Sequence, residues 1–124
     1  MTQLEFLAAD PQHPAWRSPL RRALEHAPSG VCDVTAEVEA KEVAALGPTP
    51  GVAGIEIDAP FAARLLARLT DLNLEALPSV GTVAHVRALV AWRRRDCYRI
   101  WLPQEYSEYL AEVVLDAWEG LADA

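Results

Sequence analysis

The stretch from 82 to 102, TVAHVRALVAWRRRDCYRIWL, decides the fold. Over its first half the even positions are apolar, which is the two-residue period of a strand with one buried face. A short polar connection follows at 94–96, and residues 97–102 return as a second strand. We therefore predict an antiparallel hairpin whose long first strand runs over 82–93.

Two further strands are predicted upstream. Residues 31–46 alternate small apolar side chains with polar ones, as a strand with one wet face does. The apolar set is Val34, Ala36, Val38 and Ala40. After a Gly- and Pro-rich turn at 47–51, Ile55 and Ile57 alternate with polar or small neighbours and predict the second strand.

Three segments carry the spacing of helices. The first, 18–27, has Ser18 as its cap and Pro19 in its first turn. The second follows Asp58 as its cap, and the third begins after Pro103. Each has apolar residues three or four apart. These stripes are Leu20, Ala23, Leu24 and Ala27, then Phe61, Leu65, Leu66, Leu69 and Leu72, then Tyr106, Leu110, Val113, Val114, Ala117 and Leu121.

The predicted element order after the first helix is strand, strand, helix, strand, strand, helix. It indicates an α+β domain over residues 31–124, with a ferredoxin-like antiparallel sheet and two helices packed on one face. Residues 1–30 are expected to form an N-terminal arm with its short helix, because four prolines interrupt them. The remaining edge of the sheet is filled either by 31–46 or by a neighbouring chain. Tyr106 and Tyr109 could line a pocket, but their helical spacing against Val113 favours a role in covering the sheet.

Composition excludes several classes of protein. The chain has 124 residues, 52% of them hydrophobic, and a formal charge of −7, as expected for one soluble domain. An acidic balance argues against nucleic acid as a partner, and no apolar run reaches the roughly 18–20 residues of a membrane span. The N-terminus lacks a secretory signal, and two cysteines, Cys32 and Cys97, make no disulfide framework. A cytoplasmic protein is expected.

No motif for self-contained catalysis is present in the sequence. The possible metal ligands are scattered, without the short spacing of a metal site: His13, His26, Cys32, His85 and Cys97. A Gly-x-Ser-x-Gly elbow, a phosphate-binding loop and a dinucleotide glycine pattern are all lacking. Three consecutive arginines at 93–95 could bind a phosphate or a carboxylate, but they are more typical of a solvated hairpin tip. We predict no catalytic residues and no metal on this chain.

The second face of the predicted sheet has the strongest binding character. If the helices cover the face that carries Ile55, Ile57 and Ile100, a further set of side chains points the other way. That set is Glu56, His85, Arg87, Leu89, Arg99 and Trp101. A two-layer domain leaves this face open, and Trp and Arg are the residues most typical of binding hot spots. The pattern predicts a protein interface centred on Trp101.

Several motifs resemble the gamma subunit family of heterotetrameric sarcosine oxidases. In that family a strand with a basic hairpin, a returning strand and a helix close the chain. The matching motifs are GTVAHVRALVAWRR at 81–94, DCYRIWLP at 96–103 and YSEYL at 106–110. Upstream, RSPL at 17–20 is similar to the family's opening, and GVCDVT at 30–35 to a strand shared with the glycine-cleavage T-protein.

The resemblance implies a small, non-catalytic accessory subunit with a T-protein-like fold. Its complex would oxidatively demethylate sarcosine or another N-methyl amine and pass the one-carbon unit to tetrahydrofolate. FAD, FMN, NAD and the folate site are implied in larger partner subunits, with no cofactor on this chain alone. No catalytic residue is carried over, and Asp33 in the shared strand motif is expected to be a turn or cap residue.

Two other hypotheses stay open. A free-standing T-protein-like protein could bind folate or another small acid, with Arg87, Arg99 and His85 as the complement of its carboxylates. Alternatively, two copies could join through their open sheet faces as a homodimer. An independent enzyme is the least favoured hypothesis, because the sequence holds no convergent acid, base or metal set.

Overall fold

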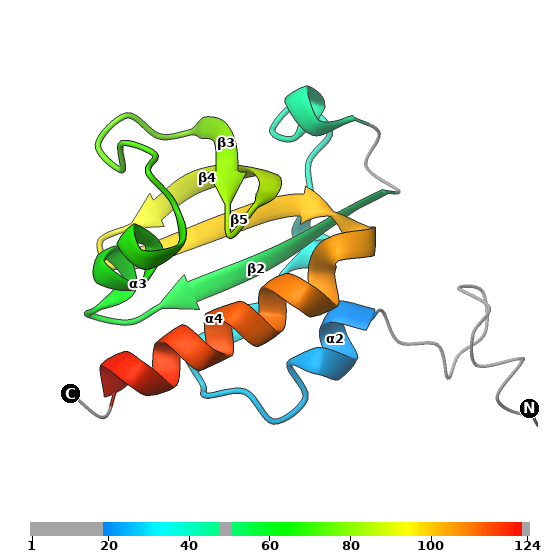
Figure 1. Cartoon of the computed structure of the whole chain (residues 1–124). Coiled ribbons are helices and arrows are strands. Elements are labelled where there is room, and N and C mark those ends of the chain that lie inside the picture. Colours follow the sequence, from blue (N-terminus) through cyan, green and yellow to red (C-terminus); the bar gives the residue numbers. More distant parts are fainter. Residues whose placement is uncertain (1–18, 48–50, 123–124) are drawn as a thin grey trace, which may run out of the picture.

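Five antiparallel strands form one sheet in the order β1-β2-β5-β4-β3 (Figure 1). The computed structural model describes residues 19–47 and 51–122. The strands are β1 (Val31–Asp33), β2 (Val52–Asp58), β3 (Ser79–Val83), β4 (Val86–Arg94) and β5 (Cys97–Pro103). The last strand of the β3–β4–β5 meander, β5, pairs with β2, which comes before the meander in the chain. One antiparallel sheet with packed helices confirms the predicted α+β class.

Three helices cover one face of this sheet, with α4 lying along it (Figure 1). They are α2 (Pro19–Ala23), α3 (Ala62–Leu69) and α4 (Ser107–Ala122). Alternate residues of the central strands, such as Ile55, Ile57 and Ile100, are fully buried beneath them. Phe61 and Trp118 meet edge to face between α3 and α4, with ring centroids 4.7 Å apart. The predicted two-residue period therefore selects the correct inner face.

The long strand predicted over 82–93 is wrong, because the chain reverses there. Ala84 and His85 have φ values of 48° and 71°, and Val83 pairs with Val86 across a two-residue turn. Such tight hairpin turns place both central residues in the left-handed region, where Asn and Gly are usual. Ala84 and His85 are not typical turn residues, so the predicted strand included both β3 and the start of β4.

The strand predicted within 31–46 is also mostly wrong. Only Val31–Asp33 pairs with β2, where it fills the edge as expected. The Asp33 carboxylate then accepts a hydrogen bond from the Thr35 N–H at 2.8 Å, which confirms its turn role. Two 3-10 turns follow, Thr35–Glu37 and Ala44–Leu46. We call residues 34–47 the strap, since they cross the second face of the sheet.

The ends of the predicted helices differ from those observed. Residues 1–18 lie outside the described residues, so the Ser18 cap does too. Leu20 and Leu24 belong to the main core, which joins α2 to the domain expected to begin at residue 31. Asp58 ends β2 instead of capping α3, because its carboxylate pairs with Arg94 across the sheet.

Candidate functional site

The strap covers the second face of the sheet, the face on which an interface was predicted. Trp101 is 0% exposed, packed in a small second core with Val34 and Val43 of the strap. The other buried members of this second core are Val52 and Leu89. The predicted side of the sheet is correct for Trp101 and Leu89, but the expectation that they are exposed is wrong.

Trp101 is held by a glycine below it and a carboxylate above it. A Cβ on Gly54, its cross-strand partner, would lie 2.3 Å from Cζ3 of the indole, so the ring lies directly against the bare backbone. The indole Nε1–H donates to Glu42 Oε1 of the strap at 3.2 Å. The indole N–H therefore has its hydrogen-bond partner within the chain. Gly54, a glycine inside a strand, was the sequence feature that could have indicated this close packing.

Arg99 is the centre of a charged cluster beside Trp101. Its Nη2 lies 3.0 Å from Glu37 Oε1 of the strap, and its Nε lies 3.0 Å from Glu56 Oε1 of β2. Burial alone would lower the pKa of Arg99, but the hydrogen bonds to these two glutamates outweigh it and raise the pKa. With only 7% of its surface exposed, Arg99 joins the strap to the sheet and is not free for a partner.

The remaining predicted site residues lie apart from Arg99. Arg87 is exposed, and its Nη2 donates to the Ala45 carbonyl of the strap at 3.1 Å. His85 is exposed in the β3–β4 turn. Arg99 pairs across the sheet with Ala91, which lies four residues after Arg87 on β4. The backbone positions of the two arginines are therefore about 13 Å apart along the strand direction. The three residues proposed for an anion site are therefore not brought together.

Both cysteines lie near the carboxylates of β2. Cys32 Sγ lies 3.8 Å from Glu56 Oε2, and burial together with the charge of Glu56 raises the pKa of its thiol. Burial, followed by the charges of Glu56 and Asp58, raises the pKa of Cys97 to about 11. Cys97, Glu56 and Asp58 offer ligand atoms within 4.8 Å of one another. Arg99 and Arg94 already pair with these carboxylates, so a cation would have to compete with two guanidinium groups.

The accessible aromatic side chains lie elsewhere on the domain. Among the described residues the exposed large hydrophobic side chains are Trp92 at 58%, Tyr106 at 47% and Tyr109 at 44%. Trp92 borders a hollow of about 440 Å³ between the strap and β4, which Glu39 and Arg93 also line. Tyr106, which ends the 3-10 turn Gln104–Tyr106, and Tyr109, in the first turn of α4, are both too exposed to cover the sheet as expected, and Tyr109 instead lines a hollow with Val113.

Many polar groups of the described residues form charge pairs and local caps. Within residues 19–47 and 51–122, neither His26 nor His85 has a hydrogen bond to a hydroxyl or thiol. Ser107, the one fully buried hydroxyl of this part, donates to the Gln104 carbonyl at 2.7 Å. This arrangement is suited to stabilising the domain and presenting a surface.

Comparison with known proteins adds no relative: no family model matches the chain, and no curated protein matches it significantly. In the part of the chain that the structure describes, every helix is too short or too polar to cross a lipid bilayer.

Proposed function

We propose that this chain is a small, non-catalytic subunit of a heteromeric, flavin-dependent oxidase of the sarcosine oxidase type. The observation that carries the proposal is the ordered run of motifs at 81–94, 96–103 and 106–110 that resembles the gamma subunit family. These motifs occupy consecutive parts of the domain, from β3 through β5 into α4. A ferredoxin-like or T-protein-like relationship of the sheet is part of the same proposal.

The distribution of charge and aromatic residues supports an accessory role. The one deeply buried charge, Arg99, connects the strap to the sheet, and exposed aromatic side chains are available for contact with other chains. In the proposed complex, FAD, FMN, NAD and tetrahydrofolate are bound by the larger subunits, which act on an N-methyl amine in the cytoplasm. This chain contributes surface and stability to the assembly.

Affinity capture from the native source tests the proposal. The full chain, tagged and produced in its own organism, is expected to co-purify in fixed stoichiometry with larger chains that carry visible flavin absorbance. The chain produced alone is expected to be colourless. Recovery of the chain without a flavoprotein at physiological ionic strength contradicts the proposal.

The alternative of a free-standing binder of folate or another small acid gains no site from the structure. Arg99 is already paired with two glutamates, and Arg87 and His85 do not converge with it. The alternative of a homodimer joined through open sheet faces has no exposed face to use, because the strap covers the centre of the second face.

A further inference from the structure

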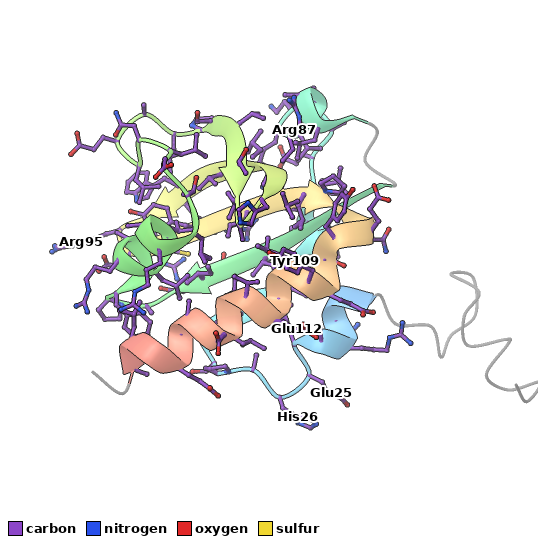
Figure 2. All side chains as sticks on the ribbon, in the orientation of Figure 1. Glu25, His26, Arg87, Arg95, Tyr109 and Glu112 are labelled. Carbon is purple, nitrogen blue, oxygen red and sulfur yellow. The ribbon has the colours of Figure 1, made fainter. Side chains whose placement is uncertain are left out.

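A groove with an aromatic end runs along α4, between this helix and the C-terminal end of α3. Two adjoining hollows, of about 470 and 580 Å³, lie against α4 and share Arg68, Leu69 and Val113. Tyr109 lines one end and Gly120 the other, so the groove follows α4 for roughly 16 Å. Figure 2 shows Tyr109 on the side of α4 near the β3–β4 hairpin. We call this feature the α4 groove.

The aromatic end of the α4 groove is exposed and preorganised. Tyr109 lines this end, and Tyr106 lies three residues before it, just outside the lining; both are nearly half exposed. The Tyr109 hydroxyl donates to the Ala84 carbonyl at 3.0 Å, which fixes its ring at the edge of the hollow. Ala84 is fixed in turn, because its N–H donates to the Leu69 carbonyl at 2.7 Å. Exposed tyrosines held in place have a low entropy cost of binding and are typical of interface hot spots.

The charge lining the α4 groove is mostly negative, since the carboxylates of Asp71, Asp116 and Glu119 stand against one guanidinium, that of Arg68. Helix α4 carries the acidic residues Glu108, Glu112, Asp116 and Glu119 and no Lys or Arg. Within the described residues none of these four carboxylates has an ion-pair partner, and Asp116 and Glu119 line the groove itself. Like charges four residues apart, and carboxylates near a helix C-terminus, both destabilise a helix. Glu112 lies on the side of α4 that faces α2 (Figure 2), so cationic groups bound in the groove would act on Asp116 and Glu119, the carboxylates nearer the helix C-terminus.

We infer that the α4 groove is a docking site for a basic, amphipathic segment of a partner protein. Apolar side chains of the segment would lie on Leu69 and Val113, between Tyr109 and Gly120. Its Lys or Arg side chains would pair with Asp116 and Glu119, which gives the site selectivity for positive charge. The inference rests on the proposed function in so far as an accessory subunit needs such a surface, while the chemistry of the occupant follows from α4 itself.

The test is a titration of the isotope-labelled full chain, followed by NMR. One probe is a synthetic helical peptide of Leu and Lys, and the other is the same peptide with Glu in place of each Lys. The Lys peptide is expected to shift backbone amides of 66–71, 84–85 and 106–120, and the Glu peptide is expected to leave them unchanged.

Variants locate the site. Tyr106→Ala alone leaves the Tyr109–Ala84 hydrogen bond intact and is expected to weaken binding of the Lys peptide several-fold. Tyr106→Ala together with Tyr109→Ala is expected to weaken that binding about tenfold. Asp116→Asn with Glu119→Gln is expected to weaken it roughly fivefold and to reduce its sensitivity to salt. Trp92→Ala, an exposed aromatic residue outside the α4 groove, is the matched control and is expected to bind as the unmodified chain does.

Any other pattern overturns the inference. No binding, equal binding of the Glu peptide, shifts centred on the strap, or insensitivity to the tyrosine variants each contradict it. The flavoprotein capture described above has a separate readout. Peptide binding without a captured flavoprotein contradicts the proposed complex and leaves the docking site in place, whereas a captured flavoprotein without peptide binding does the reverse.

Discussion

The indole of Trp101 lies directly against Gly54, its cross-strand partner on β2, and is fully buried beneath the strap. Trp101→Ala is therefore expected to lower the free energy of unfolding by about 3–5 kcal/mol, as truncation of a buried tryptophan does. Chemical denaturation measures the change, with Trp92→Ala, 58% exposed, as a control expected to stay within about 0.5 kcal/mol. Unchanged stability of Trp101→Ala would mean that the indole is not part of the core.

Arg99 is expected to contribute more to the free energy of unfolding than its exposed partner, Glu37. Arg99→Met leaves the little-exposed Glu56 with only the half-exposed Arg93, whose Nε lies 3.8 Å from Glu56 Oε1, and should cost about 2 kcal/mol of stability or more. Glu37→Gln removes a carboxylate whose side chain is 55% exposed, and should cost about 1 kcal/mol or less. Equilibrium unfolding in urea gives both values. Equal losses from the two substitutions would contradict a buried, sheet-anchored Arg99.

The thiol of Cys97 gives stability a dependence on alkaline pH. Its pKa is raised from 9.0 to about 11 in the folded chain, so the unfolded chain loses the proton first. The contribution of the protonated thiol is complete below about pH 9 and is lost as pH rises toward 11. The stability of the unmodified chain should fall more steeply over this range than that of Cys97→Ala. Parallel curves for the two proteins would contradict the raised pKa.

Single residues also show where sequence reasoning reaches its limit. The two-residue period placed Trp101, Leu89 and Arg99 on the correct side of the sheet, because alternation is a property of the strand alone. Their burial depends on the strap, whose contacts with the sheet join residues distant in sequence, such as Glu37 and Arg99. Nothing in the local pattern of 34–46 distinguishes a strand from a covering segment.

Among the elements, the β3–β4 turn holds Ala84 and His85 at positive φ. Non-glycine residues are disfavoured there by roughly 1–2 kcal/mol each. Ala84→Asn with His85→Gly is therefore expected to raise the free energy of unfolding by about 1 kcal/mol or more, since Asn-Gly suits such turns. The control Ala76→Gly, in an exposed loop without positive φ, should slightly lower it. A loss of stability in the turn variant would contradict the hairpin geometry.

Elements with strong periodicity were predictable, and those defined by turns without Gly or Asn were not. Helix α4 and strand β5 follow from unbroken apolar spacing, and they lie close to their predicted ranges. The β3–β4 hairpin was missed because tertiary hydrogen bonds from Tyr109 and to Leu69 hold its turn. The strap was missed because its buried valines, Val34 and Val43, each precede a 3-10 turn and are nine residues apart, which is not the spacing of a strand.

At the scale of the whole molecule, the chain is a helix-backed sheet whose second face is closed by its own strap. Trp101 and Leu89 of the predicted interface are therefore buried, and the accessible aromatic side chains of the described residues are Trp92, Tyr106 and Tyr109. The α+β class could be predicted from periodicity because it depends on which side chains alternate. The accessible surface could not, because it depends on how a non-periodic segment packs.

The proposed function makes this chain part of a larger flavoprotein assembly. Sedimentation of the tagged chain purified from its native source, recorded at protein and flavin wavelengths together, tests this claim most directly. The account predicts that the chain sediments in a particle several times its own 13.6 kDa, with flavin absorbance at the same boundary. A single colourless boundary at the mass of the free chain would contradict it.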